Sequence, residues 1–249
     1  MTNKSWIQYD RLALDFRSNG PQSADQEGTE RLSAIHKNIH DRVDSGDLPF
    51  LNVHQDEGVW ECVSVFAESA RDRFHDCVVL GIGGSSLGAQ ALVSALGGSG
   101  MRVHFPDNVD PTELASLLSS LDLKRTLFNC VSKSGGTIET VAQLLVVRER
   151  LKRDLGPYWN QHLVVTTDPE HGFLRELADR DELIRFEISK GVGGRFSVFT
   201  PVGLLPAALA GVDLSQLRAG ISDAVALLAG SHPDQNAALK LASDLHYLN

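Results

Sequence analysis

The chain has 249 residues, of which 42% are hydrophobic and 22% charged, the composition of an ordinary globular protein that can bury a large core. Its formal net charge of −9 argues against a general affinity for nucleic acid or for anionic membranes, so a small-molecule partner is favoured. No segment approaches the roughly 20 consecutive apolar residues that a membrane-spanning helix needs.

The three cysteines and the amino-terminal residues indicate a reducing compartment. Cys62, Cys77 and Cys130 are odd in number and lack metal-type spacing, and the latter two lie in apolar runs. Charged residues interrupt the apolar ones in residues 1–17, unlike a signal peptide. We therefore predict a cytoplasmic location, and neither a metal nor a cofactor is predicted.

The first part of the chain has a polar, helical pattern. Residues 6–44 are predicted to be helical, with Ile35, Ile39 and Val43 at four-residue spacing. A connector at residues 48–53 follows, and a helical pattern resumes at residues 59–69. Residues 1–55 are accordingly predicted to form an amino-terminal helical segment.

From residue 77 onwards, short apolar runs alternate with helical patterns. Such alternation is typical of a parallel sheet covered by helices on both faces, because parallel strands need crossover connections. The predicted strands are 77–82, 101–105, 126–131, 162–166 and 183–188. The predicted helices between them are 87–96, 111–121, 141–155 and 172–180, and two more follow at 201–210 and 214–228.

The predicted fold class is therefore α/β, a three-layer αβα sandwich with a five-stranded parallel sheet and helices at both ends of the chain. The sandwich is assigned to residues 56–212. Residues 213–249 are predicted to be a helical segment that leads to a second domain absent from this chain.

The stretch Ser132–Thr140 places hydroxyls and glycines between a buried strand and a long helix. Such a turn can bind an anion, because the first N–H groups of a helix lack partners and carry partial positive charge. Ser132, Ser134 and Thr137 add hydroxyl donors there. The alternative is an ordinary turn in which Thr137 only caps the helix.

A second glycine-rich turn, Gly81–Gly88, follows the first buried strand, where ligands bind in open α/β sheets. It fails the dinucleotide fingerprint, because Ser86 occupies the position of the third glycine. It also fails the nucleotide-binding P-loop pattern, because Ala89 and Gln90 stand where Lys and Ser or Thr belong. A nucleotide-binding protein is therefore disfavoured, and a purely structural turn is the alternative.

A third glycine-rich turn, Gly191–Ser197, follows the last predicted strand. Its glycines let a ligand approach the backbone, and Arg195 carries a permanently charged fork suited to an oxyanion. The alternative is a surface arginine on a flexible loop. Three such turns at successive strand ends favour a common site.

Three stretches, in this order and spacing, closely resemble the signatures of the glucose-6-phosphate isomerase family. They are GIGGSSLG at 81–88, SKSGGTIET at 132–140 and GGRFSVFTPVGLLPAALAG at 193–211. The resemblance spans about residues 77–211 and implies a sugar-isomerase (SIS) domain. It also implies an aldose–ketose isomerase of glycolysis and gluconeogenesis that interconverts glucose 6-phosphate and fructose 6-phosphate, needs no cofactor and forms a homodimer.

The resemblance also implies roles for individual residues. The family's active-site arginine corresponds to Arg195, beside Gly194, where a fixed cation would stabilise the enediolate transition state more than the neutral substrate. The residues that correspond to the substrate phosphate site are Gly84, Ser85, Ser132, Lys133, Ser134 and Thr137.

The chain departs from the family in two respects. Gly136 stands where the bacterial family usually has threonine, which removes one hydroxyl from the turn. The family's proton-transferring carboxylate, ring-opening histidine and late lysine all lie downstream of the matched region, and no glutamate follows Glu187. We therefore expect the chain to stop before the general base. The acids available there show no motif; they are Asp213, Asp223, Asp234 and Asp244. His232 and His246 are interpreted as solvated or helix-surface residues.

Two functions remain after this comparison. The first is a glucose-6-phosphate isomerase represented by its sugar-binding, amino-terminal half. The second is a non-catalytic SIS module that binds a phosphosugar as a sensor or regulator. Such a module has little use for an arginine at the enediolate position, so Arg195 favours the enzyme.

Overall fold

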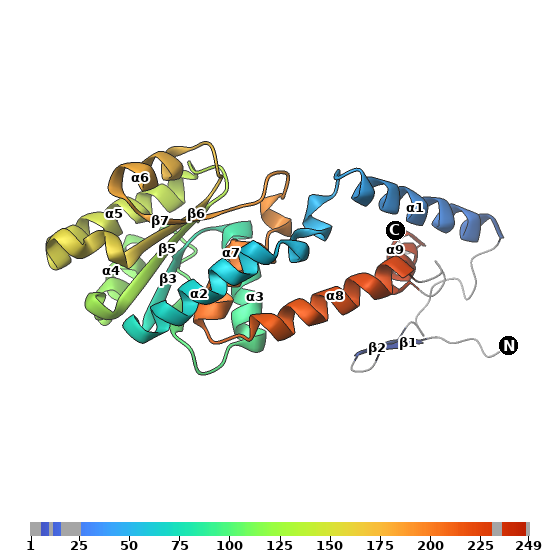
Figure 1. The fold of residues 1–249 in the computed structure, drawn as a ribbon, viewed down its shortest axis with the longest axis horizontal. Coiled ribbons are helices and arrows are strands. Elements are labelled where there is room, and N and C mark those ends of the chain that lie inside the picture. Colours follow the sequence, from blue (N-terminus) through green and yellow to red (C-terminus); the bar gives the residue numbers. More distant parts are fainter. Residues whose placement is uncertain (1–5, 10–11, 16–25, 231–235, 248–249) are drawn as a thin grey trace. The chain divides into compact units, whose positions relative to one another are not determined.

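The computed structural model describes residues 6–9, 12–15, 26–230 and 236–247 (Figure 1). The chain divides into two compact units. One unit consists of residues 49–218, and the other of the described residues before Pro49 and after Arg218.

The larger unit is built around a five-stranded sheet with the order β4-β3-β5-β6-β7 and all neighbours parallel. The apolar runs of β3, β5 and β6 are buried on both faces, as expected of strands inside a parallel sheet. The predicted α/β fold class is confirmed, and each predicted strand is present. The strands are β3 (Asp76–Leu80), β4 (Arg102–His104), β5 (Thr126–Ser132), β6 (Leu163–Thr167) and β7 (Ile184–Glu187).

Helices cover both faces of this sheet (Figure 1). One face carries α4 (Pro111–Ser120), α5 (Ile138–Leu155) and α6 (Phe173–Asp181), whose leucines share a core with β3, β5 and β6. The other side carries α2 (Glu57–Arg73), α3 (Leu87–Leu96) and α7 (Pro201–Leu209), with α7 in contact with both other helices and with β3. Every residue of α7 is buried, which explains why its sequence is apolar on all sides.

The smaller unit contains α1 (Gln26–Asp44), α9 (Ala237–Tyr247) and an antiparallel pair of strands, β1 (Trp6–Tyr9) and β2 (Leu12–Asp15). The helix α8 (Leu214–Gly230) contributes residues to both units. The helical prediction is correct for α1 but wrong for residues 6–9 and 12–15. Aromatic and β-branched side chains at Trp6, Ile7 and Tyr9 favour extended backbone, and pairing with β2 satisfies it.

Some sequence predictions fall on residues that the structure does not describe. His232 and Asp234 lie outside the described ranges, as do residues 1–5 and 16–25 of the predicted amino-terminal segment. Among the described residues, none of the helices combines the length and the apolar character that crossing a membrane requires.

Candidate active site

The order of the strands places the predicted loops together at one edge of the sheet. In the order β4-β3-β5-β6-β7 the chain runs outwards in opposite directions from β3 and β5, so the topological switch point lies between these two strands. Ligands of open α/β sheets bind at this point, outside the carboxyl ends of the strands. Leu80 of β3 is in register with Cys130 of β5, so the Gly81–Gly88 and Ser132–Thr137 turns leave the sheet at matching levels.

The turn after β5 gathers three hydroxyl groups. The Oγ atom of Ser132 lies 2.8 Å from Oγ1 of Thr137, and Oγ of Ser134 lies 3.4 Å from each of them. Thr137 occupies the N-cap position of α5, yet its side chain makes no capping hydrogen bond. The simple helix-cap interpretation of Thr137 is therefore wrong, and its hydroxyl belongs to a cluster that we call the hydroxyl cradle (Ser132, Ser134 and Thr137).

The cradle lies at the amino-terminal end of an 18-residue helix. The partial positive charge of such a helix end, together with N–H groups in its first turn, attracts an anion. Just before the N-cap, the Gly136 N–H also points to the cradle and donates to Ser134 Oγ over 3.3 Å. Neutral donors of this kind can bind an anion even on a chain of net charge −9.

The floor of the cradle is fixed by buried backbone contacts. Ser132 is 1% exposed, and its carbonyl accepts hydrogen bonds from Thr167 Oγ1 (2.8 Å) and from the Gly135 N–H (3.1 Å). Gly135 has φ +66°, and a Cβ built on it would lie 3.0 Å from the Cα of Gly172. The turn after β5 thus requires glycine at this position because it packs directly on the loop after β6.

Lys133 lies between the cradle residues in the sequence and is half-buried. Among the described residues, no hydrogen bond or ion pair is formed by its ammonium group. The structure therefore leaves this cation without a partner in the described part of the chain, and the predicted role of Lys133 in the phosphate site stays a prediction.

The first and third glycine-rich turns meet at backbone contact distance. A Cβ built on Gly84 would lie 2.5 Å from the carbonyl carbon and oxygen of Gly194 and 3.0 Å from the Arg195 nitrogen. These two turns form short 3-10 helices, η3 (Gly83–Ser85) and η6 (Gly194–Phe196). Two parts of the chain that are more than 100 residues apart are thus held together because Gly84 has no side chain.

Ser197 links the same two turns through its hydroxyl group. The buried side chain donates to the Gly194 carbonyl over 2.7 Å and approaches the Gly84 carbonyl at 3.4 Å. Phe196 stacks on Phe50, with ring centroids 4.6 Å apart. Ser197 was not among the predicted site residues, although its place in the GGRFS stretch could have suggested a supporting role.

Arg195 belongs to η6, and its side chain is exposed to solvent. Within the described part of the chain, its guanidinium forms no ion pair and no hydrogen bond. The Arg195 guanidinium is therefore free to meet an anionic ligand.

Ser85, in the first glycine-rich turn, is half-buried. Its N–H donates to the Ile82 carbonyl over 3.1 Å and so stabilises the turn itself.

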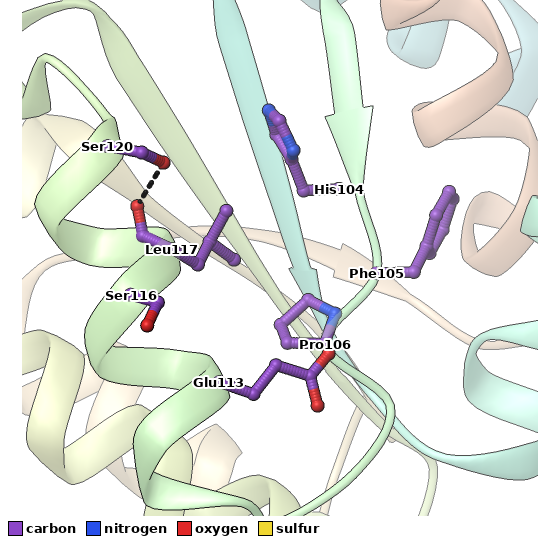
Figure 2. Close-up of a pocket in the computed structure, with 7 residues that line it drawn as sticks. All are labelled: His104, Phe105, Pro106, Glu113, Ser116, Leu117 and Ser120. Carbon is purple, nitrogen blue, oxygen red and sulfur yellow. Dashed lines mark hydrogen bonds between the residues drawn. The ribbon is translucent and has the colours of Figure 1, made fainter.

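Two hollows of the larger unit lie away from the predicted site. One of about 490 Å³ runs beside β4 and α4, where Figure 2 shows His104 on the strand and Glu113, Ser116 and Ser120 on the helix. The other, of about 420 Å³, includes Arg71 and His75 before β3. Neither hollow contains a predicted site residue, so the assignment depends on the convergence of the loops.

No general base can be assigned among the described carboxylates near the carboxyl end of the chain. The hydroxyl of Ser215 and the backbone N–H and side-chain amide of Gln216 all donate to Asp213 and lower its pKa to about 2. Asp213 is therefore ionised at neutral pH and accepts hydrogen bonds at the start of α8. Asp223 is exposed on α8. The side chains of Asp244 and His246 lie outside what the structure describes.

Comparison with known proteins gives one consistent family. The profile of the phosphoglucose isomerase family matches residues 57–245. A glucose-6-phosphate isomerase of Thermus thermophilus is 44% identical over 211 residues, which cover 84% of this chain and 51% of that protein. Its counterpart in Carboxydothermus hydrogenoformans is 40% identical over 204 residues, covering 77% of this chain and 44% of that protein.

Solved structures agree with these sequence matches. A hypothetical protein of Thermus thermophilus superimposes with a TM-score of 0.81 at 41% identity, covering 88% of this chain and 54% of that one. A glucose-6-phosphate isomerase of Chlamydia trachomatis gives 0.67 at 27% identity, covering 75% of this chain and 36% of that one. The chain spans about half the length of the curated relatives it matches.

Proposed function

Because the chain belongs to the phosphoglucose isomerase family, we propose that it forms the sugar-phosphate-binding half of an aldose–ketose isomerase that interconverts glucose 6-phosphate and fructose 6-phosphate. The observation that carries this proposal is the hydroxyl cradle at the start of α5. A phosphate placed there would accept hydrogen bonds from Ser132, Ser134 and Thr137 and would meet the positive end of the helix.

In this proposal Arg195 acts at the sugar and not at the phosphate. Isomerisation moves a proton between adjacent carbons through an enediolate, on which negative charge develops in the transition state. A guanidinium at that point stabilises the transition state more than the neutral ground state, which is the condition for catalysis. The contact between Gly84 and the Gly194–Arg195 backbone would hold the backbone of this arginine against the first glycine-rich turn.

We further propose that the general base lies outside these 249 residues. Asp213 already accepts hydrogen bonds from Ser215 and Gln216 at the start of a helix, and the chain covers only about half the length of its relatives. Proton transfer by a positioned acid or base contributes about 10²–10⁴-fold to a rate. The chain alone is therefore expected to bind sugar phosphates but to isomerise them very slowly.

If the general base lies outside these residues, a second function has to be considered, a non-catalytic SIS module that senses a phosphosugar. The backbone contact of Gly84 with Gly194 and Arg195 supports the enzyme, since binding the phosphate alone does not require an arginine held against the first glycine-rich turn. The boundaries of the SIS-type domain at residues 56–212, a homodimeric full-length protein and a cytoplasmic location remain part of this proposal.

Calorimetric titration with fructose 6-phosphate tests the cradle. Thr137→Ala should weaken binding by about 1–3 kcal/mol, the range for losing a hydrogen bond to a charged group, whereas Thr137→Ser keeps the hydroxyl and should bind like the wild type. If Thr137 served only the helix, the alanine variant would lose stability and keep its affinity. Equal affinities in all three proteins would remove the phosphate assignment.

A further inference from the structure

Two histidines of α1 lie unusually close together in the smaller unit. His36 and His40 are four residues apart on one face of the helix, and their Nε2 atoms are 3.0 Å apart. Their ring centroids are 4.5 Å apart, with an angle of 76° between the ring planes. Both side chains are half-buried. The closest atoms of the two rings are therefore the nitrogens that can carry a proton or bind a metal.

The short distance limits the protonation of the pair. Two N–H groups cannot face each other at 3.0 Å, and two unprotonated nitrogens would repel, so one nitrogen donates and the other accepts. The backbone carbonyl of Leu228, on α8, lies 3.4 Å from His36 Nε2. This carbonyl also accepts a hydrogen bond from Asn236 Nδ2 over 2.8 Å, so its position is fixed. His36 Nε2 thus has two neighbouring atoms with lone pairs, His40 Nε2 and the Leu228 oxygen.

We propose that a divalent transition-metal ion takes the place of this proton and is chelated by His36 and His40. Zinc binds histidine nitrogen at about 2.0–2.1 Å, so two cis nitrogens are about 2.9 Å apart at a right angle and about 3.3 Å apart at the tetrahedral angle. The observed 3.0 Å falls between these values. Two histidines at this spacing on a helix also provide the zinc ligands of a common metalloprotease motif.

The ligand set decides which ions the pair accepts. Imidazole nitrogens favour Cu²⁺, Ni²⁺ and Zn²⁺, whereas Mg²⁺ and Ca²⁺ require several oxygen ligands. Two protein nitrogens leave the other coordination positions to water or to the Leu228 carbonyl. The neighbouring cation Lys37 is paired with Asp41 over 2.8 Å, which reduces its repulsion of a metal ion.

This site was not predicted from the sequence. The prediction of no metal rested on the cysteine spacing, which carries no information about a histidine pair. The signal in the sequence is the spacing of His36 and His40 within the helical pattern of Ile35, Ile39 and Val43.

A metal ion that binds only when α1 is folded stabilises the folded protein. Metal binding should therefore also raise the melting temperature of the chain.

The test uses the untagged full chain and titrations with Zn²⁺ and with Ni²⁺. We expect one ion per chain, no comparable binding of Mg²⁺, and an affinity that falls at least about tenfold in His36→Gln and in His40→Gln, because each variant removes one arm of the chelate. Glutamine favours helix and retains a hydrogen-bonding amide. His171→Gln is the matched control, since the His171 side chain is 85% exposed and pairs with no other histidine among the residues that the structure describes.

A second control keeps the number of histidines and changes only their spacing. The double variant His40→Gln/Asn38→His places the second imidazole two residues from His36, on a different face of the helix, and leaves the Lys37–Asp41 pair intact, so it should not recover the affinity. In the wild type, electron paramagnetic resonance of bound Cu²⁺ should show ligation by two nitrogens. Undiminished affinity in both glutamine variants, recovery in the double variant, or a single-nitrogen spectrum would each overturn the proposal.

Discussion

The contact between Gly84 and the Gly194–Arg195 backbone predicts an asymmetric response to two similar substitutions. The Cβ of Gly84→Ala would lie 2.5 Å from the Gly194 carbonyl carbon, about 1 Å inside ordinary van der Waals contact, and backbone atoms cannot rotate away. A Cβ on Gly194 meets no atom within 4 Å. Overpacking typically costs about 1–3 kcal/mol, so Gly84→Ala should lose this much unfolding free energy. Gly194→Ala should stay within about 0.5 kcal/mol of the wild type.

Urea unfolding measures both variants, and the change in transition midpoint at constant slope gives the free energy. Titration with fructose 6-phosphate then reports whether the displaced backbone disturbs the site, and Gly84→Ala should bind more weakly than Gly194→Ala. If both variants unfolded at the same urea concentration and bound equally well, the two turns would not be in backbone contact. The positioning of Arg195 by Gly84 would then be refuted.

Four further predictions follow from the site and the core. Arg195→Gln should leave the unfolding free energy within about 0.5 kcal/mol, because the side chain is exposed, and a loss above 2 kcal/mol in urea unfolding would contradict the free guanidinium. Gly136→Ala should raise the unfolding free energy by about 0.4–1 kcal/mol, because its Cβ meets only the Ser134 oxygen at 4.0 Å and the unfolded chain loses freedom; a destabilised variant would contradict this. Burial raises the pKa of Asp76, but hydrogen bonds from His104 and Arg102 outweigh it and hold the pKa below its usual 3.8. The stabilisation from this carboxylate is therefore complete above about pH 4 and is lost as the pH falls through the lowered pKa, so urea midpoints of the wild type should converge with those of Asp76→Asn in acid. Finally, a coupled assay of the purified chain with fructose 6-phosphate should show a rate at least about 100-fold below that of a full-length relative, and near-equal turnover would place the base within the chain.

The sheet could be predicted because its signal is local. Buried parallel strands are continuous apolar runs, and a run such as Thr126–Val131 between two helical patterns has few other interpretations. The pair β1 and β2 was missed because four-residue strands with mixed polarity resemble a weak helical pattern. Their assignment depends on pairing, which periodicity in one segment does not reveal.

The residues of the candidate site could be picked out from the sequence, but their contacts could not. Ser132, Thr137 and Arg195 stand out through glycine-rich turns at strand ends. Whether Thr137 caps the helix or faces Ser132 depends on a side-chain rotamer, which spacing does not determine. The contact of Gly84 with Gly194 joins segments more than 100 residues apart, so only the fold reveals why that glycine is required.

The close packing of Gly135 on Gly172 has a consequence for the kinetics of binding. Since the turn after β5 is already held against the loop after β6, and the Thr167 hydroxyl holds the Ser132 carbonyl, the ligand finds its donors in place. A preformed site loses little conformational entropy on binding and has no slow closing step. Association with a sugar phosphate should therefore be a single fast phase whose rate rises in proportion to ligand concentration, and differences in affinity among variants of this turn should appear mainly in the dissociation rate.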